Sequence, residues 1–384
     1  MNRIICGDSL EKLRDIEAGS VQTCVTSPPY YGLRDYGVTG QIGLEATPDE
    51  FIARLVDVFA EVRRVLRDDG TLWVNMGDSY ASPQKGTGGI NGSQLSNSGS
   101  LFGARKVGMG DAKEKDLLGI PWMLAFALRA DGWYLRSDII WAKPNPMPES
   151  VTDRPTKSHE HIFLLSKQAQ YFYDADAIKE PANYPNDDRK GRAKETNKYK
   201  PDGFINGLRP GNYTHDLSFR NKRDVWTVST KPYSGAHFAT FPRDLIVPCI
   251  LAGTSEKGQC PKCGAAWERV TERTNESNWE FRKTKGAVGG SKDDGNKQQI
   301  GSGWSHDLPA NETVTTGWQP TCNCGETYTV PQIVLDPFGG AGTTAKTAQE
   351  LGREYITIEL NPKYVTDIIT PRLLATNVPL AGML

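Results

Sequence analysis

The segment from Ile333 to Thr344 restricts the fold of this chain more than any other feature of the sequence. Three apolar residues lead into the acid Asp336, and a turn with three glycines then opens a helical pattern that runs to Leu351. Glycine allows the backbone to approach a ligand closely. In a doubly wound α/β sheet, ligands bind at the carboxyl ends of the strands. We therefore expect a strand, a ligand-binding turn and a helix here.

Two common glycine motifs do not fit this segment. A P-loop has a lysine after its last glycine, and Thr343 stands there instead. The dinucleotide fingerprint has a different glycine spacing, and no acid precedes its turn. We expect the carboxylate of Asp336 to meet a cationic group, such as the ammonium of an amino acid.

A second predicted strand, from Tyr355 to Glu359, also ends in an acid. An acid about twenty residues after a glycine turn typically binds ribose hydroxyls. Asn361 and Pro362 then begin a helix as its cap and first residue. The two acids and the glycines together suit a nucleoside with a charged amino-acid tail, which describes S-adenosylmethionine. The alternative is an ordinary βαβ unit.

The N-terminal part of the chain alternates between strand and helix patterns, which predicts an α/β fold with a parallel sheet covered by helices. Thr47 to Glu50 forms a capping box, apolar residues then recur at helical spacing, and Gly70 is expected to stop that helix. The expected strands span 3–6, 21–26, 71–75, 134–141 and 161–166, and the expected helices span 9–16 and 117–130.

Directly after the strand 21–26 stands the motif Ser27-Pro28-Pro29-Tyr30. Two prolines cannot continue a strand ladder or enter a helix interior, so they predict a rigid, extended turn at the sheet edge. Such a turn holds the serine and the following carbonyl oxygens in fixed directions beside an aromatic face. This suits a planar substrate held by stacking. The alternative is a proline turn that only ends a strand.

The seven cysteines are too few for a disulfide scaffold in a chain of 384 residues. Four of them form two pairs, Cys260 with Cys263 and Cys322 with Cys324, which favours a structural zinc site of four thiolates. Reduced buried thiols and a redox pair are the alternatives. The remaining cysteines are expected in the core, and they are Cys6, Cys24 and Cys249.

The charge pattern and the apolar pattern limit where the protein acts. The formal net charge of −1 excludes a uniformly basic protein but allows a local basic face that binds nucleic acid. A basic and aromatic stretch spans 181–224. No signal-peptide pattern opens the chain, and the longest apolar stretch, at 245–251, is too short to span a membrane. We expect a cytoplasmic protein without membrane contact.

The proline and glycine motifs resemble the catalytic and cofactor motifs of amino-directed DNA methyltransferases. The catalytic motif precedes the cofactor motif, as in the permuted beta group of that family, and the resemblance covers nearly the whole chain. It implies a Rossmann-like AdoMet-dependent methyltransferase sheet, circularly permuted in motif order, with a target-recognition insert and a four-cysteine zinc-knuckle insert. The implied regions are a catalytic half (1–180), a target-recognition region (181–226), a cofactor-pocket segment (227–258), a zinc-binding insert (259–326) and a cofactor-binding half (327–384).

The resemblance also implies roles for individual residues. The catalytic residues would be Ser27, Pro28, Pro29 and Tyr30. S-adenosylmethionine would be bound by Asp8, Thr26, His237, Phe241, Asp336, Pro337, Phe338, Gly339, Gly340, Gly342, Thr343, Glu359 and Asn361. DNA would be bound by Arg189, Lys190, Arg192, Lys194, Arg220, Lys222 and Arg223. The segment from Trp141 to Glu160 is similar to later catalytic-domain motifs, without an assigned chemical role.

The function implied is methyl transfer to the exocyclic amine of a base flipped out of duplex DNA. Serine before Pro-Pro-Tyr favours cytosine N4, and adenine N6 is the alternative. Rivals are a protein or RNA methyltransferase, whose usual motif order is the reverse, and an inactive zinc-bearing DNA-binding module. A nicotinamide dehydrogenase is a more distant alternative. The resemblance further implies a prokaryotic or phage origin and allows a cognate restriction endonuclease; monomer and homodimer both remain open.

Overall fold

The computed structural model describes residues 2–33, 37–81, 110–181, 219–231, 241–273 and 313–375. The chain divides into two compact units. The larger unit comprises Met1–Ile178, Arg223–Glu268 and Pro320–Leu384, and the smaller unit comprises Lys179–Lys222 and Arg269–Gln319. Each unit is described by itself below.

The larger unit is built on one eight-stranded sheet, in the order β1-β12-β11-β2-β3-β5-β4-β8. All neighbouring strands are parallel except β5, which runs antiparallel to β3 and β4. The predicted α/β fold is therefore confirmed, and the sheet is parallel as predicted except at β5. The strands are β1 (Arg3–Cys6), β2 (Val21–Thr26), β3 (Leu66–Met76), β4 (Tyr134–Ala142), β5 (His159–Ser166), β8 (Val225–Thr227), β11 (Ile333–Asp336) and β12 (Glu354–Glu359).

The two ends of the chain meet inside this sheet. β1 pairs with β12, with Ile5 opposite Ile358, and β11 pairs with β2, with Leu335 opposite Cys24. β11 therefore lies between a strand from the C-terminal part and a strand from the N-terminal part of the chain. Because these strands are parallel, their carboxyl ends lie at one edge of the sheet. This brings together turns that are more than 300 residues apart in the sequence.

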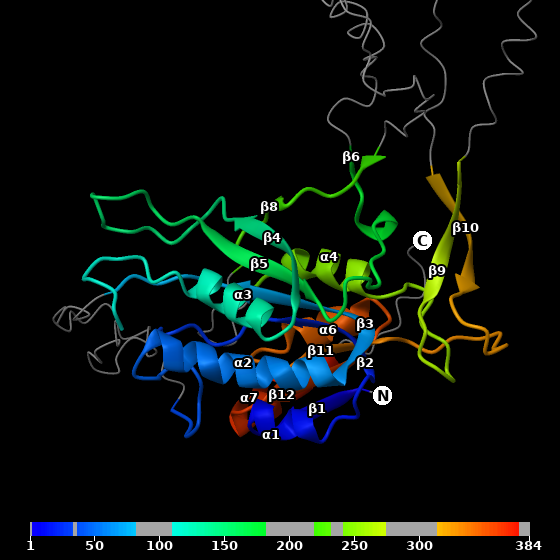
Figure 1. Ribbon diagram of the computed structural model, residues 1–384, viewed down its shortest axis with the longest axis horizontal. Coiled ribbons are helices and arrows are strands. Elements are labelled where there is room, and N and C mark those ends of the chain that lie inside the picture. The colour runs from blue at the N-terminus through cyan, green and yellow to red at the C-terminus, as the bar shows by residue number, and fades with distance from the viewer. Residues whose placement is uncertain are drawn as a thin grey trace, which may run out of the picture. The chain divides into compact units, whose positions relative to one another are not determined.

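Helices cover both faces of the sheet (Figure 1). On one face α1 (Ser9–Arg14), α2 (Pro48–Val65) and α3 (Ile120–Ala130) bury apolar residues in a common core. On the other face α4 (Arg243–Gly253), α6 (Thr343–Glu350) and α8 (Thr370–Leu374) contribute to a second core. The short helix α7 (Pro362–Tyr364) and a π-helical turn (Val365–Ile369) precede α8, and a 3-10 turn spans Asp176–Ile178.

The capping box predicted for α2 is present, but the predicted end of the helix is wrong. The Thr47 hydroxyl accepts a hydrogen bond from the Glu50 amide at 3.2 Å, and the Glu50 carboxylate accepts one from the Ala46 amide at 3.0 Å. The helix ends at Val65, and Gly70 lies within β3. An irregularity in the β2–β3 pairing falls next to this glycine, where a side chain would meet the carbonyl of Arg67. Gly70 therefore serves the strand, since close backbone approach excludes a Cβ there.

One further expectation needs correction. Cys6 is exposed at the end of β1, because it is the last residue before the chain turns away from the sheet, whereas Cys24 and Cys249 are buried as expected. The apolar stretch around Pro248 forms α4, with the proline inside the helix. Among the described residues, no helix combines the length and the apolar character needed to cross a membrane.

The smaller unit contains two short pairs of strands, of which β6 and β7 are antiparallel. β6 (Glu180–Pro181) pairs with β7 (Phe219–Arg220), and the Arg220 guanidinium forms an ion pair with Glu180 at 2.9 Å. β9 (Trp267–Arg273) and β10 (Thr313–Pro320) form a two-stranded ribbon that extends into this unit. The Arg269 guanidinium lies 4.5 Å from the centre of the Trp318 ring.

Candidate active site

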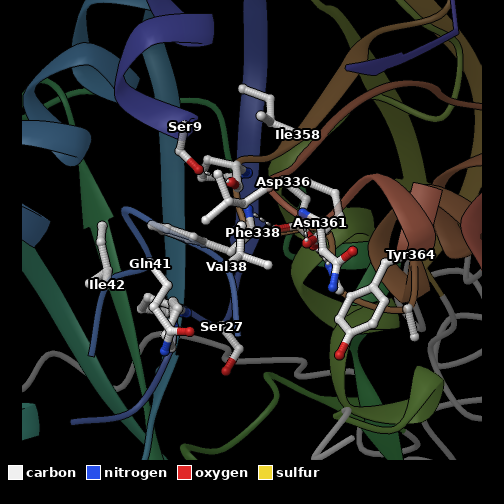
Figure 2. Close-up of a pocket in the computed structure, with 18 of the residues that line it drawn as sticks. Ser9, Ser27, Val38, Gln41, Ile42, Asp336, Phe338, Ile358, Asn361 and Tyr364 are labelled. Atoms are coloured by element: carbon white, nitrogen blue, oxygen red, sulfur yellow. Dashed lines mark hydrogen bonds between the residues drawn. The ribbon is translucent and has the colours of Figure 1, made fainter. Parts of the chain in front are cut away.

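A pocket opens at the carboxyl ends of β2, β11 and β12, where the two ends of the chain meet (Figure 2). The proline turn after β2 lines it together with the glycine turn after β11. A loop between β2 and α2 covers part of it, with Gln41 and Ile42 in the wall. The lining residues that the sequence predicted are Asp8, Ser27, Pro28, Pro29, Tyr30, Phe241, Asp336, Pro337, Phe338, Gly339, Gly340, Thr343, Glu359 and Asn361.

Asp336 is held at the base of this pocket by hydrogen bonds to one of its carboxylate oxygens. Oδ1 accepts from the Thr26 hydroxyl at 2.7 Å and from the Phe338 amide at 3.1 Å. The side chain is buried, and this burial raises the pKa of Asp336, although the hydrogen bonds partly oppose the shift. A buried carboxylate without a cationic partner is costly. Asp336 is therefore suited to receive a positively charged ligand group.

The glycine turn brings backbone amides close to the second acid. The Gly340 amide donates to Glu359 Oε2 at 2.7 Å, and the Gly339 amide donates to the carbonyl of Ile358 at 2.8 Å. A Cβ on Gly339 would lie 2.4 Å from the Thr357 hydroxyl oxygen, so any other residue would require Thr357 or the turn to shift. Gly340 adopts a φ of +52°. The turn is thereby pressed against the end of β12.

Glu359 ends β12 with its carboxylate facing the pocket. Its Oε1 accepts from the Asn361 amide at 2.8 Å, and burial raises the pKa of Glu359. The Asn361 side chain in turn accepts from the Lys363 amide at 3.0 Å, as expected for a helix cap. Each carboxylate oxygen retains acceptor capacity beyond these single bonds. Glu359 is thus placed to accept hydrogen bonds from ligand hydroxyls.

The proline turn contacts a network of polar side chains. The sequence had not predicted a role for Asn75 or Glu160 in this network. The Tyr30 hydroxyl donates to Glu160 Oε2 at 2.7 Å. The Asn75 amide nitrogen donates to the Tyr30 oxygen at 2.8 Å and to Glu160 Oε2 at 2.9 Å, and lies 3.5 Å from Ser27 Oγ. Burial and the charge of Glu160 raise the pKa of Tyr30 well above its ordinary value. Tyr30 therefore remains a protonated donor rather than a base.

Of the other predicted site residues, some lie beside the pocket and others lie elsewhere or outside the described residues. Asp8 caps α1 by accepting from the Glu11 amide at 3.1 Å, beside the pocket. Thr26 and Gly342 support the wall, the first through Asp336 and the second as the left-handed residue before α6. His237 and four of the predicted DNA contacts, Arg189, Lys190, Arg192 and Lys194, lie outside the described residues. Lys222 and Arg223 follow β7 in the chain, and Arg220 pairs with Glu180.

Several pocket residues were missed by the sequence reasoning. Ser9 donates from its hydroxyl to the Pro337 carbonyl at 2.6 Å, and Tyr364 faces the pocket from α7 (Figure 2). Gln41 and Ile42 lie in a loop, where no periodicity marks a residue. Glu160, which contacts Tyr30 behind the pocket, ends the segment from Trp141 to Glu160, to which the sequence assigned no chemical role.

The four paired cysteines come together in the larger unit. Their Sγ atoms all lie within 4.8 Å of one another. In a tetrahedral zinc site with Zn–S bonds of about 2.3 Å, neighbouring sulfurs are roughly 3.8 Å apart. Each pair is followed by a glycine with positive φ, Gly264 at +71° and Gly325 at +75°. The donor set and its spacing therefore fit a tetrahedral metal ion.

The fold and this pocket define a methyltransferase-like α/β protein. The chain matches the N6/N4 methyltransferase family model, described as DNA methylase, over residues 21–260 and 327–370. It therefore belongs to this family and is a DNA methyltransferase, as the motifs predicted.

Similar proteins agree with this assignment. The chain is 40% identical over 367 residues to the type II methyltransferase M.Cfr9I of Citrobacter freundii, covering 96% of this chain and 86% of that protein. It is 41% identical over 360 residues to M.XycI of Xanthomonas campestris pv. cyanopsidis, covering 94% and 84%. Among solved structures, PvuII DNA methyltransferase (cytosine-N4-specific) has a TM-score of 0.51 at 14% identity, covering 100% of this chain and 89% of that one, a likeness of fold.

Proposed function

We propose that this enzyme transfers a methyl group from S-adenosylmethionine to N4 of a cytosine flipped out of duplex DNA. One observation carries the proposal: Ser27 of the proline turn and Asp336 and Glu359 of the cofactor motifs line the same pocket. A donor held by one motif would then face an amine held by the other. The motif order in the chain, with β1 and β2 joining the sheet beside β12 and β11, supports the permuted arrangement.

The cofactor fits the charges and the backbone of the pocket. Asp336 would accept from the ammonium of the methionine moiety, which compensates its buried charge. Glu359 would accept from the ribose hydroxyls, and the Gly339–Gly340 turn allows close approach. Asp8 and Phe241 also line the pocket, which supports a place for Asp8 near the adenine, as the family resemblance implies, and for Phe241 near the methionine moiety. The bound cofactor supplies an electrophilic methyl group.

The protein then has to make an aromatic amine nucleophilic. The lone pair of an exocyclic amine is delocalised into the ring. Ser27 Oγ and the carbonyl oxygen of Pro28 would accept from its two N–H groups and favour a tetrahedral nitrogen. The amine held in this way would attack the methyl group that S-adenosylmethionine supplies, in exchange for the bond of that group to sulfur, and would release one proton to solvent. Positioning and fixed dipoles supply the rate enhancement, without a covalent enzyme intermediate.

Access to the amine requires base flipping, because the target atom is not reachable inside a duplex. Flipping costs roughly a few kcal/mol, and stacking on an aromatic ring returns about 1–3 kcal/mol. Tyr30 lines the pocket and supplies such a ring. Basic residues of the stretch 181–226 would contact DNA phosphates and base edges.

The target atom follows from the residue before the two prolines. Ser27 offers a neutral hydroxyl acceptor, whereas members of the family that methylate adenine mostly have Asp or Asn there. Incubation with labelled S-adenosylmethionine and mixed-sequence duplex, followed by nucleoside analysis, tests this. We expect labelled N4-methylcytosine. Labelled N6-methyladenine would overturn the target assignment, and no labelled nucleoside would overturn the activity.

We also propose that the four-cysteine cluster holds a structural zinc ion. Cys260, Cys263, Cys322 and Cys324 would supply all four ligands, which leaves no open position for catalysis. Hydrogen bonds already order the segment around the first pair, with the Gly264 amide donating to the Cys260 carbonyl at 2.8 Å. The ion would connect the chain before β9 with the chain after β10.

A further inference from the structure

Behind the proline turn, side chains from the two strands β3 and β5 meet at the hydroxyl of Tyr30. Glu160 of β5 accepts from Tyr30 and from Asn75 of β3 through Oε2. Its other oxygen accepts from the ammonium of Lys143, which directly follows β4. Lys143 also lies 4.3 Å from the centre of the Trp141 ring. The Glu160 carboxylate therefore connects Lys143 and Asn75 with Tyr30 of the proline turn.

This network is largely withdrawn from water. The side chains of Glu160 and Lys143 are 14% and 17% exposed, and Asn75 is 4% exposed. Removing one partner of a buried ion pair leaves a costly uncompensated charge. The ammonium of Lys143 therefore compensates the charge of Glu160, whose second oxygen stays available as an acceptor for Tyr30.

Stability alone does not explain the network. The Asn75 oxygen Oδ1 is buried and has no hydrogen-bond partner among the residues that the structure describes. A buried acceptor without a partner costs about 1–3 kcal/mol. Such exceptions in a native structure require a separate explanation. The amide nitrogen of Asn75 provides one, because it contacts both Tyr30 and Glu160.

The position of the Tyr30 ring is restricted from a second side. A Cβ on Gly77 would lie 2.6 Å from Tyr30 Cε2, so the ring lies directly against the backbone after β3. The backbone of Gly77 fixes one edge of the ring, and Glu160 and Asn75 fix its hydroxyl. The ring consequently has one place beside Ser27.

We propose that Glu160, supported by Lys143 and Asn75, is a positioning residue that holds the Tyr30 ring in the orientation that receives the flipped base. This inference rests on the proposed function. It makes Glu160 act through Tyr30 and without contact to the base or the cofactor. A misplacement of about 1 Å in a catalytic arrangement can cost about 100-fold in rate.

A double-mutant cycle on the single-turnover rate of methyl transfer tests this role. Its variants are Glu160→Ala, which removes the acceptor for the Tyr30 hydroxyl, Tyr30→Phe and the combination of both, assayed on whichever base the native enzyme methylates. We expect each single variant to lose about 10- to 100-fold in rate. Because Glu160 acts through the Tyr30 hydroxyl, the double variant should be no slower than the slower single variant. S-adenosylmethionine affinity, measured by calorimetry, should not change.

The control variant is Glu61→Ala, which removes a more exposed ion pair to Arg64 on α2 and should retain the native rate. If Glu160→Ala does not fold, the uncharged pair Lys143→Ala/Glu160→Ala replaces it in the cycle. Multiplicative losses in the double variant would overturn the positioning role. If the losses are multiplicative and the native enzyme methylates DNA, the proposed function still holds. A native enzyme without methyl transfer to DNA would overturn both.

Discussion

The hydroxyl of Thr26 donates a hydrogen bond of 2.7 Å to the carboxylate of Asp336, although 310 positions separate the two residues. At the same place the Thr344 hydroxyl donates a hydrogen bond of 3.1 Å to the Val25 carbonyl. These contacts fix the end of β2 against the end of β11 and the start of α6. The proline turn and the glycine turn are therefore parts of one rigid edge.

Replacing Ser27 by alanine should abolish most of the methyl transfer. The variant removes one acceptor aimed at the target amine, and the loss of one such preorganised hydrogen bond costs about 100- to 1000-fold in turnover. Binding of S-adenosylmethionine and of DNA should remain within about twofold, because the bond that Ser27 Oγ accepts from Asn75 is long, at 3.5 Å, and little of the fold depends on it. Single-turnover kinetics and binding titrations measure both. Ser20→Ala, at a hydroxyl that bonds the Glu17 carbonyl, is the matched control, and undiminished turnover of the Ser27 variant would refute its role.

Replacing Asp336 by asparagine should weaken cofactor binding and stabilise the free enzyme. The amide oxygen preserves the bonds from Thr26 and Phe338, whereas the buried negative charge is lost. Calorimetry should show at least about a tenfold loss of S-adenosylmethionine affinity, which corresponds to about 1.4 kcal/mol. Thermal unfolding at neutral pH should move upward. Asp57→Asn, on the exposed face of α2, should change neither quantity, and equal affinity for native enzyme and Asp336→Asn would contradict the assignment.

The same aspartate predicts a pH dependence. Burial raises the pKa of Asp336, so the folded protein keeps this proton to higher pH than the unfolded chain. Its contribution to the free energy of unfolding therefore falls as pH rises from about 3.9 through the raised pKa. Cofactor affinity changes in the opposite direction, because the ammonium needs the ionised form. The difference between native enzyme and Asp336→Asn, in unfolding and in affinity across this range, isolates both effects, and a difference independent of pH would contradict them.

Native mass spectrometry should find one zinc ion per chain, lost in Cys260→Ser. Cys260 is buried among the four thiols, and a hydroxyl is a poor replacement for a thiolate ligand of zinc. Because metal binding contributes to folding, the melting temperature should also fall. Cys6→Ser, at an exposed cysteine outside the cluster, should retain the metal. A folded native chain without metal would end the zinc proposal.

Replacing Gly339 by alanine should destabilise the cofactor turn. The new Cβ would lie 2.4 Å from the Thr357 hydroxyl oxygen at the end of β12. Overpacking of this kind costs typically about 1–3 kcal/mol, visible in chemical denaturation, and should reduce cofactor affinity as well. Gly317→Ala in β10, where nothing lies within 4 Å of the new Cβ, is the control. Unchanged stability and affinity would show that the turn has room to adjust.

Local patterns in the sequence predicted most of the strands and the two turns that line the pocket. The apolar run before Asp336, the glycines after it and the proline pair after Thr26 identified the strand ends and both motifs, because strand, turn and cap preferences depend on near neighbours. The end of α2 was predicted wrongly because Gly70 does not end a helix. It lies in β3, where a Cβ would meet the carbonyl oxygens of Arg67 in the same strand and of Gln22 in the paired strand β2.

The tertiary structure decided which residues work together. Sheet pairing placed Asp336 beside Thr26, and the antiparallel strand β5 brought Glu160 under Tyr30. The sequence contains Glu160 and Lys143 within one motif but gives no sign that their charges meet behind the proline turn. Such contacts follow from strand order and register, which are set by the packing of the whole sheet rather than by any local segment.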